Sequence, residues 1–429
     1  MAKVGCSQSA IGWAARTPSR FPAGRPLEYP RRSMPKRRTK RGPSRTALSG
    51  DCDVLVCGAS FAGLTVAREL AGTGARVLIV DRYELGERQT SACAAPTEWL
   101  EALGLEGSIR QTFGDLVVHT PHVTARMDLP WTFSTFDYTE LCSLLFAQCD
   151  AQFETATIKG AAGPSQGAPG VERSTGGPAA PGLVAVQTDR GELRAPLAVD
   201  CLGWRRVLGR GYQPPEAPLS RGLEVHPRGA GEALEIWIDR SYVPAGYGWS
   251  FPAQNEVRVG VGSFDPRFHV KDSTVNLAGD LRRDAVRYQG NWIPHRLRDA
   301  TEGDVFFVGD AAGHCLPLTA EGIRTAFYFG IACGRELRRV VEGRISREAA
   351  LSRYGAFSRR HEWHFRWLLR VQRLIPRVPP RALALALRGM ALEPFVDWSF
   401  EHYLRIAHPA YARELGARPK PRPAVAVAA

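Results

Sequence analysis

The sequence predicts an α/β fold that combines a Rossmann-like domain, an inserted antiparallel β-sheet and a C-terminal helical segment. Three observations predict it. A strand, a glycine loop, a helix and a second strand follow one another over residues 51–81, and a buried strand before Gly309-Asp310 leads into another helix. Between these two halves, residues 222–264 show the alternation of short strands. A strand–helix pattern that stops and resumes about 250 residues later indicates one domain interrupted by an insertion.

The first half contains a loop suited to a phosphate group. After the apolar strand 53–57, the chain has the pattern G-x-S-x-x-G, formed by Gly58, Ala59, Ser60, Phe61, Ala62 and Gly63. Gly58 permits a tight turn, and Gly63 permits close packing of the following helix on the sheet. The N-terminus of that helix directs free N–H groups and a partial positive charge at a pyrophosphate. Ser60 stands where the middle glycine of such loops is usual.

Two acidic residues end strands at positions suited to the rest of a dinucleotide. Asp81 ends the second strand about 20 residues past the loop, where a carboxylate binds a ribose hydroxyl, and Arg82 follows it. Asp310 ends the apolar strand 305–308 and can accept a hydrogen bond from a ribityl hydroxyl. An ordinary helix cap is the alternative interpretation of Asp310.

The helix predicted over Glu321–Leu337 completes the second half. Its N-terminus is expected to face a flavin ring, where the helix dipole stabilises negative charge. The two halves together predict a protein that binds FAD at both ends of one domain. The candidate cofactor-binding residues are Gly58, Ala59, Ser60, Phe61, Ala62, Gly63, Asp81, Arg82, Gly309, Asp310, Pro317, Gly322 and Ile323.

These segments resemble the geranylgeranyl reductase family, a branch of the aromatic-hydroxylase-like flavoproteins. The stretch Pro244–Pro252 is similar to that family's P-x-x-Y-x-W-x-F-P signature on the substrate-side sheet, and the resemblance covers roughly residues 51–342. It implies an FAD-dependent oxidoreductase that reduces carbon–carbon double bonds of an apolar, isoprenoid-type substrate. It also implies NADPH or NADH as the electron donor, although no second dinucleotide loop is visible in the sequence.

The signature supplies the candidate substrate residues. Tyr247, Trp249 and Phe251 alternate along a predicted strand and therefore share one face. Such an aromatic wall can hold a flat or polyene substrate, and plain core packing is the alternative. Cys93 stands where the family keeps a Cys, although alanines replace the two glycines that follow it. Its thiol is the candidate catalytic proton donor, and a buried structural Cys is the alternative.

Other activities of the same fold remain open. A hydroxylase of an aromatic or polyketide-like molecule would use O₂, and such enzymes commonly carry Gly-x-Asn where this chain has Gly322-Ile323-Arg324. A halogenase needs a Lys beside the flavin, and no Lys lies between Lys40 and Lys159. A carotenoid cyclase would use a carboxylate such as Glu321. A flavin-binding protein without enzymatic activity is a further alternative.

The charge of the chain is concentrated at its N-terminus. Residues 1–50 contain three Lys and nine Arg against one Glu, a net charge of +11 of the chain's +13. This region also contains six Pro and lacks apolar periodicity, so we expect a disordered basic tail. A transit peptide is one explanation of the tail, and an over-extended gene start with Met34 as the true start is another. Because the rest of the chain carries only +2, we expect no nucleic-acid partner.

The predicted organisation has seven parts. The FAD-binding domain is expected in three pieces, the substrate-side strands and the antiparallel substrate domain lie between them, and a helical region follows. After the tail of residues 1–50, these parts are 51–115, 116–136, 137–210 with a loop over 160–182, 211–295, 296–350 and 351–429.

The location of the protein follows from its cysteines and its C-terminal region. The nine Cys have no C-x-x-C spacing, which argues against a metal site and indicates a reducing, cytoplasmic location. Near Trp363 and Trp367, an apolar stripe is flanked by several Arg. Such a helix either covers a core or lies on an anionic membrane surface, so peripheral membrane contact is one of two interpretations. The oligomeric state is not indicated by the sequence.

Overall fold

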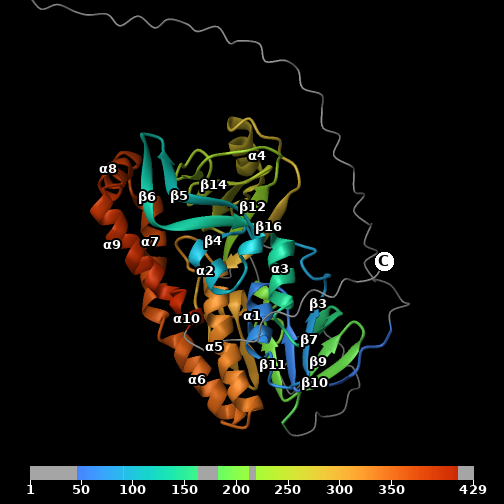
Figure 1. Cartoon of the computed structure of the whole chain (residues 1–429). Coiled ribbons are helices and arrows are strands. Elements are labelled where there is room, and N and C mark those ends of the chain that lie inside the picture. The colour runs from blue at the N-terminus through green and yellow to red at the C-terminus, as the bar shows by residue number, and fades with distance from the viewer. Residues whose placement is uncertain (1–45, 90, 163–181, 212–218, 414–429) are drawn as a thin grey trace, which may run out of the picture. The chain divides into compact units, whose positions relative to one another are not determined.

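The computed structural model describes residues 46–89, 91–162, 182–211 and 219–413, which belong to one compact unit (Figure 1). Its centre is a sheet of six strands in the order β17-β18-β11-β2-β3-β7. All neighbours are parallel except β17 and β18. The strands are β2 Val54–Cys57, β3 Val77–Asp81, β7 Ala151–Thr155, β11 Leu197–Asp200, β17 Thr301–Glu302 and β18 Val305–Phe307. The sheet thus joins segments from three separate regions of the chain, as the interrupted pattern predicts.

Helices cover this sheet because their apolar faces pack against it. α1 (Phe61–Glu69) and α5 (Ile323–Val341) lie side by side, and α6 (Arg347–Arg359) packs next to α5. A Cβ at Gly334 would lie 2.5 Å from the Cβ of Glu69, so glycine permits the close contact of α5 with α1. The side chain of Asp137 caps α3 (Tyr138–Phe146) by accepting a hydrogen bond from the N–H of Glu140. The predicted helix over 321–337 is confirmed with small shifts of its ends.

A small second sheet brings part of the expected tail into the fold. Its order is β1-β10-β9-β8, with bounds Gly50–Asp51, Gly191–Ala195, Val184–Thr188 and Ile158–Ala162. The N–H of Leu48 donates to the carbonyl of Arg190, and the Arg190 guanidinium donates to the side chain of Thr46. The fold therefore starts at least five residues earlier than the sequence indicates. The rest of the expected tail, and most of the loop 160–182, lie outside the described residues.

This boundary gives a testable difference between two deletions. Removing residues 1–33 is expected to leave thermal stability unchanged, because these residues show no pattern that would form a core. Removing residues 1–50 deletes Gly50 of β1 together with the hydrogen bonds that Thr46 and Leu48 form with Arg190. It is expected to lower the midpoint of thermal unfolding by roughly 2–4 °C. Circular dichroism melts of both variants check this. Identical midpoints for the two deletions would show that residues 34–50 add nothing to stability.

The inserted part forms a sheet of eight strands in the order β16-β12-β15-β14-β13-β5-β6-β4. Every neighbouring pair is antiparallel except β13 and β5. The strands are β4 Ala94–Pro96, β5 Ile109–Thr120, β6 Val123–Phe136, β12 Leu219–Val225, β13 Leu234–Trp237, β14 Gly246–Ala253, β15 Glu256–Ser263 and β16 Gln289–Pro294. The predicted strands of this region are therefore confirmed.

Two helical assignments in this part need correction. The sequence over residues 98–114 favours a helix and a turn, but α2 spans only Thr97–Ala102 and β5 begins at Ile109. The glycine and the short polar residues of β5 interrupt the alternation of apolar and polar residues that would indicate a strand. In addition, α4 (Lys271–Asp280) covers one face of the sheet through Leu277 and was not predicted.

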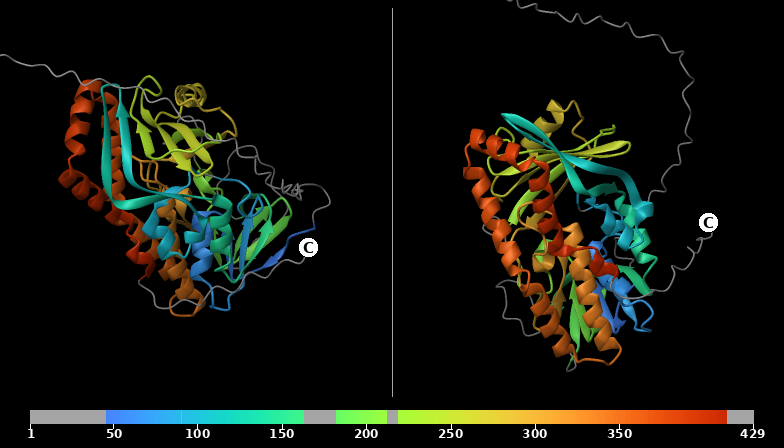
Figure 2. Two further views of the ribbon diagram at one scale, coloured as in Figure 1. Left: turned by 45° about the horizontal axis from the view of Figure 1, so that its top comes forward. Right: turned by 60° about the vertical axis from the view of Figure 1, so that its left-hand side comes forward.

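The C-terminal helices form an outer layer beside the β5–β6 hairpin (Figure 2). They are α7 Glu362–Leu374, α8 Pro380–Met390, α9 Glu393–Leu404 and the short α10 Ala410–Arg413. Leu387 of α8 and Val396 of α9 join Val118 and Met127 of the hairpin in a small core. Trp99 is fully buried, and its indole N–H donates to the carbonyl of Ala407 over 2.9 Å. Among the described residues, no helix is long and apolar enough to cross a membrane.

Candidate flavin and substrate site

One large cavity, of about 1680 Å³, is lined by both main sheets and by the C-terminal helices. A pocket for one small ligand measures about 300–1,000 Å³, so this cavity has room for two. It brings together most residues that the sequence singles out. These are Ser60, Phe61, Ala62, Asp81, Arg82, Gly309, Asp310, Gly322 and Ile323 from the predicted cofactor set, and Tyr247, Trp249 and Phe251 from the predicted substrate set.

The glycine loop between β2 and α1 depends on close backbone contacts beneath the cavity. Gly58 has a φ of +111°, and a Cβ there would lie 2.4 Å from the carbonyl oxygen of Cys201 on the neighbouring strand segment. A Cβ at Gly63 would lie 1.9 Å from the carbonyl oxygen of Gly58. Neither glycine lines the cavity, so both act by shaping the loop. Ser60 begins α1 without a side-chain cap, which leaves the N–H groups of the first turn available to an anion.

Asp81 is held at the edge of this loop by the backbone. Its carboxylate accepts hydrogen bonds from the N–H of Ala59 over 2.8 Å and from the N–H of Tyr83 over 3.0 Å. Burial raises the pKa of this carboxyl above its ordinary value, and the hydrogen bonds oppose that shift. The loop and the acid are therefore one unit. Two oxygens that each accept one bond retain lone pairs for ribose hydroxyls.

Asp310 lies in a short turn, Gly309–Ala312, directly after β18. In the described part of the chain, its carboxylate has no hydrogen-bond partner, and burial raises its pKa to about 6. Asp200 offers a comparison, because burial also raises its pKa to about 6, yet it accepts bonds from the N–H groups of Leu202 and Leu208. Asp310 caps no helix. An unpartnered carboxylate that faces a large cavity fits a ligand that donates hydroxyl groups, as FAD does.

A buried arginine that the sequence analysis missed supports the Asp310 turn. Arg206 has a φ of +49°, and its guanidinium donates to the carbonyls of Asp299 and Ala311 over 2.8 and 2.9 Å. The same group pairs with Glu302 over 3.0 Å and stacks 3.5 Å from the centre of the Phe307 ring. No sequence signal identifies it, because an Arg side chain is usually exposed.

The predicted aromatic residues line the cavity side of β14. A Cβ at Gly260 of β15 would lie 2.2 Å from the Trp249 ring, so the indole lies flat across the neighbouring strand only because that residue is glycine. The indole N–H donates to Glu224 over 3.2 Å, which fixes the ring direction. The hydroxyl of Tyr247 donates to the carbonyl of Thr319 beside the flavin-side helix. All three side chains line the cavity, so they do not serve core packing alone.

A charged cluster at the start of α5 also faces the cavity. Arg324 is fully buried and donates to both carboxylate oxygens of Glu321 over 2.7 and 2.9 Å. The hydroxyl of Tyr403, from α9, donates to Glu321 and lies within hydrogen-bond distance of Thr319. No sequence pattern indicates Tyr403, because it lies 79 residues from Arg324 along the chain. The C-terminal helices therefore belong to the site.

Cys93 and Pro317 lie outside the cavity lining. The thiol of Cys93 is fully buried and donates to the carbonyl of Ser91 over 3.2 Å, and burial raises its pKa well above the ordinary value. The guanidinium of Arg258 holds this segment in place by donating hydrogen bonds to the carbonyls of Ala92 and Cys93. Cys93 thus has a structural role in this conformation, and its catalytic role stays a prediction. The carbonyl of Pro317 accepts a bond from Gln372 of α7.

Comparison with known proteins agrees with this geometry. Residues 51–128 match the family described as FAD binding domain. The chain carries an FAD-binding domain. Over 106 residues it is 32% identical to a geranylgeranyl diphosphate reductase of Rhodobacter capsulatus, covering 24% of this chain and 26% of that relative. Over 135 residues it is 29% identical to a digeranylgeranylglycerophospholipid reductase of Methanococcus vannielii, covering 29% of this chain and 34% of that relative.

Solved structures extend the likeness over most of the chain. A geranylgeranyl bacteriochlorophyll reductase-like protein from Thermoplasma acidophilum superposes with a TM-score of 0.70 at 16% identity, over 86% of this chain and 99% of that one. PqsL of Pseudomonas aeruginosa, a probable FAD-dependent monooxygenase, reaches 0.54 at 18% identity, over 81% and 99%. The sequence alignments span only about a quarter to a third of the two relatives. The comparisons confirm the resemblance to geranylgeranyl reductases and the flavoprotein fold.

Proposed function

We propose that this FAD-dependent oxidoreductase reduces a carbon–carbon double bond of an apolar, isoprenoid-type substrate, with NADPH or NADH as the electron donor. One observation carries the proposal: the aromatic wall of β14 lines the same cavity as the predicted FAD-binding residues. The reductase names of the relatives support it. Bound FAD, once reduced, would supply the hydride.

The chain's own tasks are to place the double bond and to exclude water. Trp249 has a fixed orientation through Glu224 and Gly260, so it offers a rigid apolar surface. Holding a substrate against a rigid surface lowers the entropic part of the barrier. The loop at Thr319 connects this wall to α5 through Tyr247 and Tyr403, so substrate contacts and cofactor contacts share one framework.

Replacing the central aromatic residue tests the substrate role. Trp249→Ala is expected to lower the rate with a lipid alkene at least tenfold while FAD content stays near one per chain, because the ring touches the substrate side of the cavity. Stopped-flow reoxidation of the reduced flavin by the alkene gives the rate. The matched control is Trp237→Ala on the same sheet, since Trp237 stacks on His119 outside the cavity. Both changes cost stability, typically about 3–5 kcal/mol when the ring is buried. Equal rates in the two folded variants would make Trp249 a core residue.

The predicted proton donor needs its own test. Cys93→Ser keeps the size and the hydrogen bond to Ser91 but replaces the thiol with a much weaker acid. If the thiol donates the proton, alkene reduction slows while flavin reduction by the nicotinamide continues unchanged. Cys142→Ser, at another buried free thiol, is the control. Equal loss of both half-reactions, or loss of neither, would assign Cys93 a purely structural role.

A hydroxylase is the second candidate, because the fold is also that of PqsL. Anaerobic turnover separates the two reactions, since a hydroxylase consumes O₂ and a reductase does not. Continued alkene reduction without O₂ supports the proposal, and activity that requires O₂ contradicts it. Halogenation also requires O₂, so turnover in air with added bromide or chloride, followed by mass analysis of the product, detects it. Among the described residues lining the cavity, Lys271 is the only lysine, and it comes from α4 rather than from the flavin side.

A further inference from the structure

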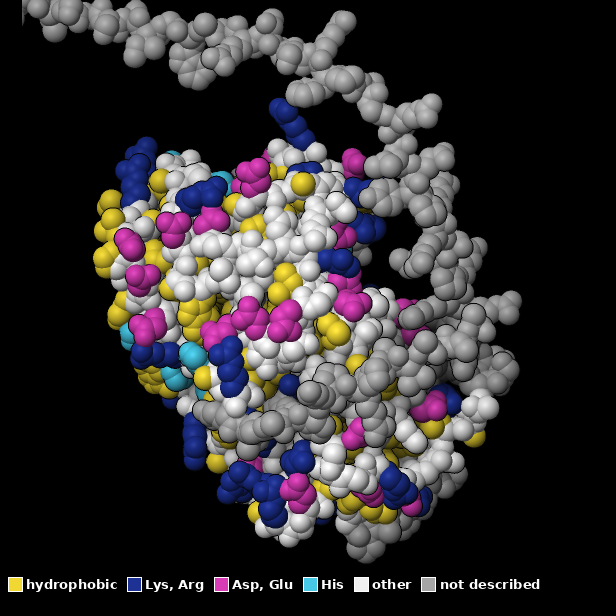
Figure 3. Space-filling model, viewed as in Figure 1, with side chains coloured by type: hydrophobic (Ala, Val, Ile, Leu, Met, Phe, Trp, Pro, Cys, Tyr) yellow, Lys and Arg dark blue, Asp and Glu magenta, His cyan; other side chains and the backbone are white. Residues whose placement is uncertain are grey.

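The C-terminal helices carry an unusual concentration of exposed apolar side chains. Within the described chain, eight of the ten exposed large hydrophobic residues come from α7, α8, α9 and their connections. We call this set the apolar rim: Trp363, Trp367, Leu374, Leu385, Met390, Leu392, Phe395 and Trp398. Figure 3 shows hydrophobic side chains along the edge that α8 and α9 form, at the left of the view. Monomeric proteins rarely expose such a set on one layer without a partner.

The apolar rim also marks the entrance of the cavity. Trp363 and Trp367 of α7 are 63% and 52% exposed. Phe395 and Trp398 of α9 are 38% and 57% exposed. All four also line the cavity that contains Trp249. A side chain that both faces solvent and lines a cavity lies at its mouth. The cavity therefore opens through the rim, and a ligand that enters there passes over aromatic rings.

Basic residues are concentrated in the segment that carries most of the apolar rim. Residues 359–392 contain eight Arg and one Glu. Every one of these arginines is exposed, and in the described part of the chain only Arg366 forms an ion pair, with Glu362 at 3.7 Å. Unpaired surface arginines around an apolar patch attract an anionic, flat partner. The adjoining α9 carries Glu393, Asp397 and Glu401, so the positive charge lies on residues 359–388 rather than on α9.

We propose that the apolar rim docks this protein on an anionic lipid bilayer, with the cavity mouth facing the lipid. Trp and Phe side chains favour the interface between head groups and acyl chains, and arginines contact the phosphate layer while their stems cover apolar surface. An apolar substrate can then pass from the bilayer into the cavity without crossing water. The docking proposal stands whether or not the proposed reduction is correct. The reduction only explains why an apolar substrate would use this entrance.

Vesicle flotation with the full, FAD-loaded chain tests docking without measuring any reaction. The probes are vesicles of phosphatidylcholine alone and vesicles of phosphatidylcholine with phosphatidylglycerol. We expect binding to the anionic vesicles that weakens with salt. Trp367→Ala with Trp398→Ala is expected to lower the partition coefficient about tenfold or more, because each ring contributes apolar area to the interface. The matched control, Val286→Ala with Tyr288→Ala, removes two other exposed apolar side chains and should leave binding unchanged.

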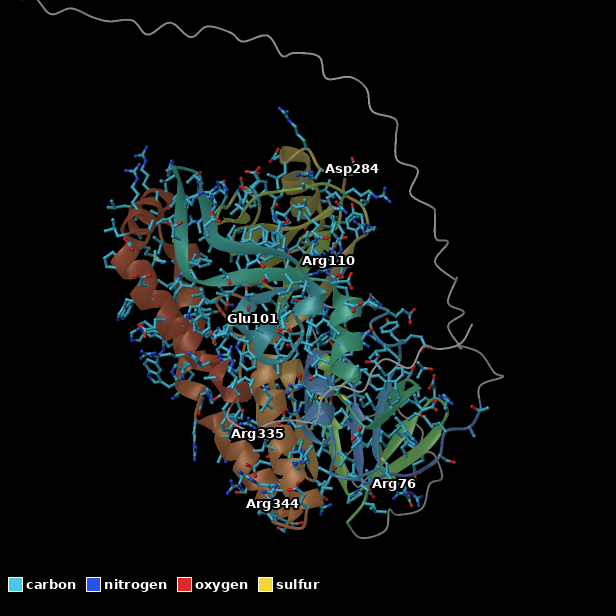
Figure 4. All side chains as sticks on the ribbon, viewed as in Figure 1. Arg76, Glu101, Arg110, Asp284, Arg335 and Arg344 are labelled. Carbon is cyan, nitrogen blue, oxygen red and sulfur yellow. The ribbon has the colours of Figure 1, made fainter. Side chains whose placement is uncertain are left out.

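Charge is tested separately because the N-terminal basic region can also bind anionic lipid. That region is identical in all variants, so only differences between variants are used. Arg370→Gln with Arg373→Gln is expected to lower binding severalfold, and Arg76→Gln with Arg344→Gln, at the end of the molecule away from α8 in Figure 4, is the control for equal charge loss. Equal binding by the rim variants and their controls would overturn the proposal. So would a concentration-dependent dimer that the Trp pair abolishes, because the rim would then bind a second copy.

Discussion

Gly58→Ala is expected to destabilise the protein strongly and to abolish FAD binding. The physical reason lies in the backbone. A Cβ at this position would lie 2.4 Å from the carbonyl oxygen and 2.7 Å from the carbonyl carbon of Cys201, and a neighbouring backbone cannot rotate away as a side chain can. The φ of +111° adds strain for any residue with a Cβ, on the order of 1–3 kcal/mol. We expect a total loss of at least about 3 kcal/mol in the free energy of unfolding.

A matched glycine separates strain from collision. Gly74 has a φ of +76°, and a Cβ there would meet no atom within 4 Å. Gly74→Ala therefore carries only the strain and is expected to cost about 1 kcal/mol with full flavin content. Urea unfolding and absorbance at the flavin band measure both quantities. Equal effects of the two substitutions would show that β11 can move aside. A side chain at position 58 would thus point into the sheet, towards Cys201.

The glycine loop and the Asp310 turn could be predicted from sequence because they are local. Each consists of a strand, a turn that needs glycine, and the start of a helix, and the chemistry depends on backbone groups within a few residues. The alternation of Tyr247, Trp249 and Phe251 is local in the same sense. For that reason, most of the candidate residues predicted from the sequence line the cavity.

The site residues that the sequence does not indicate depend on contacts between distant segments. Arg206 acts through the carbonyls of Asp299 and Ala311, about a hundred residues along the chain. Tyr403 reaches Glu321 only because α9 returns beside α5. Neither contact leaves a periodic or spaced signal in one sequence. Cys93 shows the opposite case, since its position in a family motif indicates chemistry while its burial depends on the packing of β4 and β6.

Asp310→Asn is expected to remove most of the bound FAD and yet to stabilise the protein without FAD. The carboxylate has no protein partner, and burial raises its pKa to about 6 from an ordinary value of 3.8. The folded protein without FAD therefore disfavours the ionised form, so the contribution of this carboxyl to stability is fully present below about pH 4 and is lost as the pH rises through 6. At neutral pH the neutral amide avoids this cost, which is up to about 3 kcal/mol. FAD binding gains from the ionised carboxylate, which accepts ribityl hydroxyls strongly.

The two effects have opposite signs, which makes the experiment decisive. Thermal unfolding of the wild type and the variant after FAD removal gives stability between pH 4 and 8, and fluorescence titration with FAD gives affinity. Wild-type affinity is expected to fall as the pH decreases below 6, up to about tenfold per pH unit, whereas the variant binds weakly at every pH. Asp200→Asn is the contrast, because its carboxylate accepts two backbone N–H groups and its loss should destabilise the fold instead. A variant at Asp310 that keeps full FAD affinity, or that unfolds more easily than the wild type at neutral pH, would show that this carboxylate serves the fold rather than the flavin.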